Sequence, residues 1–235
     1  MLVLVGCGFV GSSLATEAAK RLWAHDLTPR WRTIDGDVFD DRNAANQNCY
    51  PGDAGKPKAR IIAQELQDYK QNLAVGTSLD AHHVRVDETN IDALLEGSSL
   101  IIDAVDNVAT RQLLWMYGVK HGVPVMHVGV SRAGTGAVEW TYRDYDTFSL
   151  SPLALAGRPL PADPDEKLKP CELLVHRRNG LLVGHAAAVA LTAYMGIDPE
   201  ESFESQATLT TWRVGADGVV LRGMMLLETL DPSED

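Results

Sequence analysis

Short apolar segments and helical periodicities alternate along the first 130 residues of the chain. The run from Leu2 to Val5 is continuously apolar and ends at a glycine, which is typical of a strand buried on both faces. Apolar residues at helical spacing predict helices at 12–23, 58–69 and 107–121. A second strand is predicted at 31–34, a short strand at 84–86, a buried strand at 100–104 and another strand at 123–128. This alternation predicts an α/β protein whose mostly parallel sheet has helices on both faces.

The pattern changes after residue 130. Alternation weakens, and the prolines between Pro152 and Pro170 predict a long loop. A helix is predicted at 180–194, and alternating residues over 208–227 around a turn at Asp217-Gly218 predict an antiparallel C-terminal hairpin. We therefore expect a Rossmann-like, nucleotide-binding core over 1–130 and an extension over 131–235 that packs on the same domain.

The turn after the first strand carries the first candidate chemistry. Gly6, Gly8 and Gly11 form a G-x-G-x-x-G motif between a predicted strand and a predicted helix, as in dinucleotide-binding turns. Asp35 follows Gly11 by 24 positions and can accept a hydrogen bond from a ribose hydroxyl. Two alternatives stay open: a glycine turn used only for packing, and an NAD(P)-dependent oxidoreductase. Against the oxidoreductase, the sequence has no Tyr-x-x-x-Lys pair and no evident substrate domain.

Composition and charge restrict the partners. The 235 residues include 21 Lys and Arg against 32 Asp and Glu, a formal net charge of −11, which repels nucleic acid and anionic membranes. An anionic ligand therefore needs a local positive site. The sequence has no apolar run of about 18 residues and no signal-peptide pattern at its start, so we expect a cytoplasmic protein. Three cysteines without a Cys-x-x-Cys pair predict no structural zinc.

Three further blocks of sequence carry a resemblance to a known family. The first is Asp35-Gly-Asp37, followed by Asn43, Asn46 and Gln47. The second is Gly55-Lys-Pro-Lys58, and the third is Asp103-Ala-Val-Asp106-Asn107 with Arg111. Their order and internal spacing resemble the D-x-D, N-L-x-R-Q, G-x-x-K and D-x-x-D-N motifs of the ThiF/MoeB/HesA family. This family comprises bacterial relatives of ubiquitin-activating enzymes, and the likeness covers about the first 130 residues.

The resemblance implies ATP-dependent adenylation of a carboxylate, with release of pyrophosphate. The expected acceptor is the C-terminus of a ubiquitin-like or sulfur-carrier protein, the expected cofactors are ATP and Mg²⁺, and the expected assembly is a homodimer. The resemblance implies nucleotide contacts from Gly6, Gly8, Gly11, Asp35, Asp37, Asn43, Asn46, Gln47, Lys58, Asp103 and Asn107. The implied catalytic residues are Asp106, which also binds Mg²⁺, Lys58, Arg42 and Cys171.

The chemistry agrees with two of these assignments. Lys58 can bridge phosphates, since attack at the α-phosphate develops negative charge that cations stabilise. Asp106 follows a buried strand, and a carboxylate there suits Mg²⁺ held together with phosphate oxygens. Alternatives stay open: Lys56 and Lys58 as a solvated first helical turn, and Asp106-Asn107 as a helix cap. Asn43 and Gln47 are either ligand contacts or ordinary loop amides.

The sequence departs from the family at one charged position. Asn46 stands where the family has arginine, and a neutral amide cannot offset phosphate charge. Arg42 or Arg111 is expected to compensate; otherwise the chain is a nucleotide-binding scaffold that has lost catalysis. Cys171 is either a thioester-forming nucleophile, helped by neighbouring basic residues, or a buried apolar residue.

Overall fold

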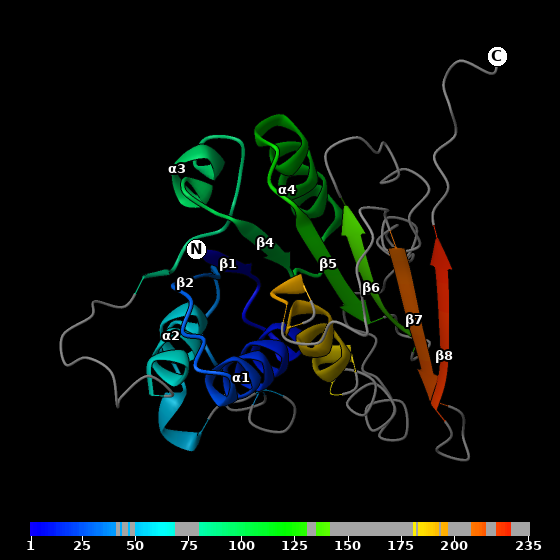
Figure 1. The fold of residues 1–235 in the computed structure, drawn as a ribbon. Helices are drawn as coiled ribbons and strands as arrows, with labels where there is room; N and C mark the ends of the chain where they lie inside the picture. Colours follow the sequence, from blue (N-terminus) through cyan, green and yellow to red (C-terminus); the bar gives the residue numbers. More distant parts are fainter. Residues whose placement is uncertain are drawn as a thin grey trace, which may run out of the picture.

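One eight-stranded sheet organises this computed structural model (Figure 1). The structure describes residues 1–40, 43, 47, 50–68, 80–130, 135–141, 181, 183–192, 194–196, 208–214 and 220–226. Five parallel strands stand in the order β3 (Ala81–His82), β2 (Trp31–Ile34), β1 (Leu2–Val5), β4 (Leu100–Asp103) and β5 (Val125–Val130). The sheet continues antiparallel through β6 (Thr135–Thr141), β7 (Thr208–Val214) and β8 (Val220–Leu226).

Helices cover both faces of the parallel strands (Figure 1). Helices α1 (Phe9–Ala24) and α2 (Lys58–Asp68) pack on one face, and α3 (Ile91–Leu95) and α4 (Val108–His121) pack on the other. Because a strand alternates its side chains, β1 sends Leu2 and Leu4 into the first core and Val3 and Val5 into the second. Two buried faces explain the continuous apolar run, and the predicted α/β fold is confirmed.

A further helical segment lies on the face that carries α1. Residues 181, 183–192 and 194 are helical, within the predicted helix at 180–194. A Cβ atom on Gly184 would lie 2.8 Å from the Cβ atom of Ser13, so only glycine permits this close approach to α1. Val183, Ala187 and Leu191 join the same core as Leu14 of α1.

Three elements differ from the prediction. The strand expected at 84–86 lies earlier, at Ala81–His82, where the backbone pairs with β2. Asp80 helps to fix this register, because both of its carboxylate oxygens lie 3.0 Å from Nε of Arg32 on β2. Burial alone would raise the pKa of Asp80, but Arg32 and His82 outweigh it and lower that pKa. Neither α3 nor β6 was predicted. The proline-rich stretch and the Asp217-Gly218 turn lie outside the described residues.

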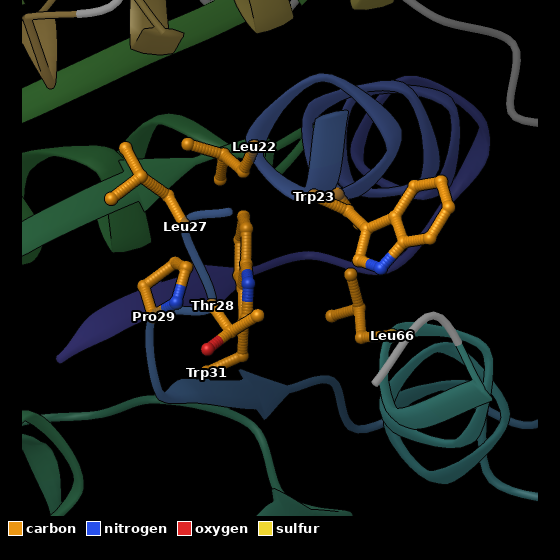
Figure 2. A pocket seen from close by; sticks show the side chains of 8 residues that line it. Leu22, Trp23, Leu27, Thr28, Pro29, Trp31 and Leu66 are labelled. Atoms are coloured by element: carbon orange, nitrogen blue, oxygen red, sulfur yellow. The ribbon is translucent and has the colours of Figure 1, made fainter. Parts of the chain in front are cut away.

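The apolar pocket in Figure 2 lies at the amino ends of the parallel strands, whereas the glycine turn lies at their carboxyl ends. Trp31, which opens β2, lines it, whereas the glycine turn follows the end of β1, and the two strands run parallel. Its lining is Ala19, Leu22, Trp23, Leu27, Thr28, Pro29, Trp31 and Leu66. This pocket is therefore separate from the candidate chemistry. Within the described part of the chain, no helix is long and apolar enough to cross a membrane.

Candidate functional site

In the glycine turn between β1 and α1, two glycines are required by packing and the third leaves the N-terminus of α1 open. Gly6 has a φ of +92°, and a Cβ there would lie 2.7 Å from backbone atoms of Ala104. A Cβ on Gly11 would lie 1.9 Å from the carbonyl oxygen of Gly6. These two glycines are required by packing, whereas a Cβ on Gly8 would meet no atom of the described residues within 4 Å. Gly8 is also the N-cap of α1 and makes no side-chain cap, so the helix N-terminus is open to an anion or a ribose.

Asp35 ties the glycine turn to the end of β2. Its Oδ2 accepts from the backbone amide of Cys7 at 2.7 Å, and its Oδ1 accepts from the amide of Asp37 at 2.7 Å. Burial raises the pKa of Asp35, although both amides and the charge of Lys58 act in the opposite direction. Each carboxylate oxygen retains acceptor capacity for a ribose hydroxyl. Burial also raises the pKa of the Cys7 thiol well above its usual value, so Cys7 is an inert core residue.

The two candidate lysines have different environments. Lys58, the first residue of α2, is only 8% exposed, and its Nζ lies 3.8 Å from Oδ2 of Asp37. Its backbone amide donates to the carbonyl of Asp37 at 3.0 Å, which fixes this pair. Lys56 is exposed and pairs with Asp53 at 3.0 Å. The solvated alternative is therefore wrong for Lys58, and only Lys56 is solvated.

A second cation reaches the same carboxylate. Nη2 of Arg85 lies 3.2 Å from Oδ1 of Asp37, and the Arg85 side chain is 84% exposed. A Cβ on Gly36 would lie 2.3 Å from Cγ of Arg85, so a glycine is needed there for this arginine to lie across the backbone. Arg85 was not among the residues predicted from the sequence. Nothing in its local pattern indicates the site, because the pairing of β2 with β3 brings it across 48 positions to Asp37.

The polar residues at the end of β4 and directly after it have three different roles. Asn107 is the N-cap of α4, and its Oδ1 accepts from the amide of Thr110 at 2.8 Å. Asp106 is exposed, and no residue that the structure describes forms a hydrogen bond or ion pair with its carboxylate. The capping alternative thus applies to Asn107 and leaves the Asp106 carboxylate available. Asp103 is expected at the nucleotide but is fully buried instead.

Asp103 is the centre of a buried ionic network. Its Oδ2 lies 3.0 Å from Nη1 of Arg111 and 2.6 Å from Nδ1 of His127, and its Oδ1 accepts from the amide of Val105 at 3.1 Å. Arg111 is 6% exposed, and its Nη2 donates to the carbonyls of Val105 and Val128. The expectation that Arg111 offsets phosphate charge is therefore wrong, because its guanidinium is bonded inside the protein.

The remaining candidates lie between β2 and α2 or further along the chain. Oδ1 of Asn43 accepts from the amide of Asp40 at 2.8 Å, so this side chain shapes the loop. The Oε1 atom of Gln47 is buried and has no hydrogen-bond partner among the described residues. Arg42, Asn46 and Cys171 lie outside the described residues.

The donor set fits a magnesium-bound nucleotide. Gly8, Asp35, Lys58 and Asp106 lie at the carboxyl ends of β1, β2 and β4 or at the helix that follows, which is where open α/β sheets bind ligands. In the described ranges, no three His, Cys, Asp or Glu side chains form a group that could hold a metal. Mg²⁺ bound to phosphates needs only one or two protein carboxylates, which Asp106 can supply.

Comparisons with known proteins agree on a family. The ThiF family model matches residues 1–214. The SAMP-activating enzyme E1 of Haloferax volcanii is 29% identical over 127 residues, which are 54% of this chain and 44% of that protein. The sulfur carrier protein ThiS adenylyltransferase of Bacillus subtilis is 29% identical over 129 residues, 53% of this chain and 35% of that protein. The crystal structure of E. coli MccB with AMPCPP and MccA matches with a TM-score of 0.70 and 13% identity, over 98% of this chain and 64% of that one. The chain thus aligns with less than half the length of these two curated relatives.

Proposed function

The chain belongs to the ThiF family, and from this premise we propose that it transfers AMP from ATP to a carboxylate. The observation that carries the proposal is the meeting of complementary groups at one edge of the sheet. They are an open helix N-terminus at Gly8, the carboxylate of Asp35, the buried ammonium of Lys58 and the exposed carboxylate of Asp106. These are the groups needed for ribose, phosphate and Mg²⁺.

The proposed reaction is an in-line displacement. An oxygen of the acceptor carboxylate forms a bond to the α-phosphorus of ATP, and the bond from that phosphorus to the bridging oxygen of pyrophosphate breaks. Asp35 holds the ribose, while Lys58 stabilises negative charge on the phosphates and, being buried, acts with little screening by water. Asp106 would hold Mg²⁺, which would offset charge on the leaving pyrophosphate.

The acceptor is proposed from the relatives. Two relatives are named as a SAMP-activating enzyme and a ThiS adenylyltransferase, and the structure of MccB was solved with MccA. We infer that the acceptor here is the C-terminal carboxylate of a ubiquitin-like or sulfur-carrier protein. The working form is proposed to be a cytoplasmic homodimer. Arg42 as a phosphate ligand and Cys171 as a thioester nucleophile complete the proposal, and mass spectrometry after incubation with ATP and acceptor, with and without thiol, tests the thioester.

ATP–pyrophosphate exchange with candidate acceptors tests the reaction. Asp106→Asn should lower the exchange rate at least about tenfold, a loss of ~1.4 kcal/mol of transition-state stabilisation. Glu88→Gln is the matched control, since it removes one negative charge from an exposed side chain before α3. Exchange unaffected by Asp106→Asn would refute the metal role.

Two other results would replace the proposal. ATP binding without exchange for any acceptor would indicate the catalytically degenerate scaffold, and exchange restored by Asn46→Arg would trace that loss to the missing family arginine. Tight NADH binding without ATP binding would indicate an oxidoreductase.

A further inference from the structure

We propose that Arg111 and His127 are positioning residues for the Asp106 carboxylate. His127 acts through the carboxylate of Asp103, and both of these residues are 0% exposed. Arg111 acts through the same carboxylate and also through the carbonyl of Val105. The network holds the turn 104–107, and this turn presents Asp106 to the ligand. The consequence for metal binding rests on the proposed function, whereas the restraint on the turn does not.

The network fixes the peptide unit next to Asp106. The amide of Val105 donates to Oδ1 of Asp103, and the carbonyl of Val105 accepts from Nη2 of Arg111. That carbonyl and the amide nitrogen of Asp106 belong to one planar peptide group, so holding the carbonyl orients the plane that leads into the Asp106 Cα. On the other side, Asn107 is fixed as the N-cap of α4. The backbone of Asp106 is held on both sides, while its carboxylate has no partner among the residues that the structure describes.

The position of the network argues for a role beyond packing. Asp103 and His127 face each other in the register of β4 and β5. Two residues earlier on the same face, the corresponding pair is Ile101 and Val125, both buried and apolar. Buried ionic groups pay a large desolvation penalty, and apolar residues of similar volume are often at least as stabilising. The ionic pair of Asp103 and His127, at the point where the sheet meets the turn 104–107, is therefore better explained by orientation of that turn than by stability.

Arg111 links three elements beneath the turn. It extends from α4, pairs with Asp103 on β4, and donates to the carbonyl of Val128 on β5 at 2.8 Å. A monodentate cation cannot reproduce this, since lysine has one nitrogen for the carboxylate and the two carbonyls. Arg111→Lys therefore keeps the charge opposite Asp103 but releases the Val105 carbonyl.

Two measurements on the full chain test the proposal. Hydrogen exchange of the Val105 amide, which donates to Asp103, should accelerate in His127→Leu and in Arg111→Lys. The dissociation constant of Mn²⁺ in the presence of AMPCPP, measured by electron paramagnetic resonance without turnover, should rise roughly 10- to 100-fold with one site per chain retained. His127→Asn, whose amide nitrogen replaces Nδ1, should restore most of the affinity. Thr192→Val, a buried polar substitution away from the turn, should change neither measurement.

A merely structural role gives different results. Partial unfolding would lower the number of Mn²⁺ sites without changing the dissociation constant. In an Asp106→Asn background, His127→Leu should weaken Mn²⁺ binding no further, because its effect passes through Asp106; an undiminished effect there would overturn the proposal. If His127→Leu does not fold, Arg111→Lys serves instead. If the wild type binds no Mn²⁺ with AMPCPP, the proposed function fails, and exchange of the Val105 amide alone decides the positioning role: unchanged exchange refutes it.

Discussion

Substituting the glycines of the β1–α1 turn one at a time should separate nucleotide binding from folding. Gly8→Ala adds a Cβ that meets no described atom within 4 Å, and Gly8 has φ −72° and ψ −158°, which alanine adopts freely. Alanine is a poorer N-cap than glycine but reduces the entropy of the unfolded chain, so stability should stay within about 1 kcal/mol of wild type. Gly6→Ala combines a left-handed φ with overlap against Ala104, together about 2–6 kcal/mol.

The effect of Gly8→Ala should appear in nucleotide binding and not in stability. If the ligand approaches the backbone at Gly8, the added methyl group should cost about 1–3 kcal/mol of binding, or roughly 5- to 150-fold in Kd. Isothermal calorimetry of ATP binding gives that Kd, and thermal unfolding gives the stability. For a chain of this size, Gly8→Ala should keep Tm within about 4 °C, whereas Gly6→Ala should lower it by at least about 4 °C.

Two outcomes for Gly8→Ala would contradict this prediction. If Gly8→Ala is folded and binds ATP as the wild type does, the ligand does not approach this backbone, and the turn serves packing alone. A large loss of Tm in Gly8→Ala would instead contradict the open space at this position.

Three further predictions concern charged residues. Lys58→Met should slow ATP–pyrophosphate exchange at least about tenfold. The rate of Lys56→Met, at an exposed and solvated position, should stay within about twofold of the wild-type rate. Equal effects of the two substitutions would contradict the role assigned to the buried lysine. Arg85→Ala should raise the KM for ATP about two- to fivefold with kcat unchanged, since so exposed a cation contributes at most ~1 kcal/mol. An unchanged KM in steady-state kinetics would exclude Arg85 from the site. Asp80, whose pKa is lowered by its basic partners in spite of burial, contributes stability above its unfolded pKa of about 3.9 and loses it as pH falls through the folded value. Urea unfolding should therefore show Asp80→Asn less stable than wild type by about 0.5–1 kcal/mol at pH 7, with the difference vanishing at low pH.

The predictable part of the fold is the part with a strong local pattern. Continuous apolar runs identified β1 and β4 because both faces of these strands are buried. The five-residue helix α3 is too short to show a helical period, and in β6 Gly136 and Ala137 dilute the alternation of its larger residues. Both elements exist in the context of the sheet and its neighbours, which no local window contains.

Some residues of the candidate site were predictable from the sequence, and their partners were not. Gly8, Asp35 and Asp106 were predictable because each stands at a fixed distance from the end of a recognisable strand. The partners of these residues were not, since strand register determines them. Arg85 reaches Asp37 through the pairing of β2 with β3, and His127 reaches Asp103 through the pairing of β4 with β5.

The charge of the site explains how so acidic a chain can hold a triphosphate. Asp37 pairs with both Lys58 and Arg85, so the two cations are already neutralised in part before a ligand arrives. A phosphate would exchange one anionic partner for another, and the net gain is the difference between two interactions rather than a full Coulomb attraction. That difference is larger for Lys58, because its buried ammonium is poorly solvated whichever anion it faces. Arg85, which belongs to none of the sequence motifs, should therefore adjust the affinity for the nucleotide. Lys58, which is buried, should determine whether the phosphate binds productively.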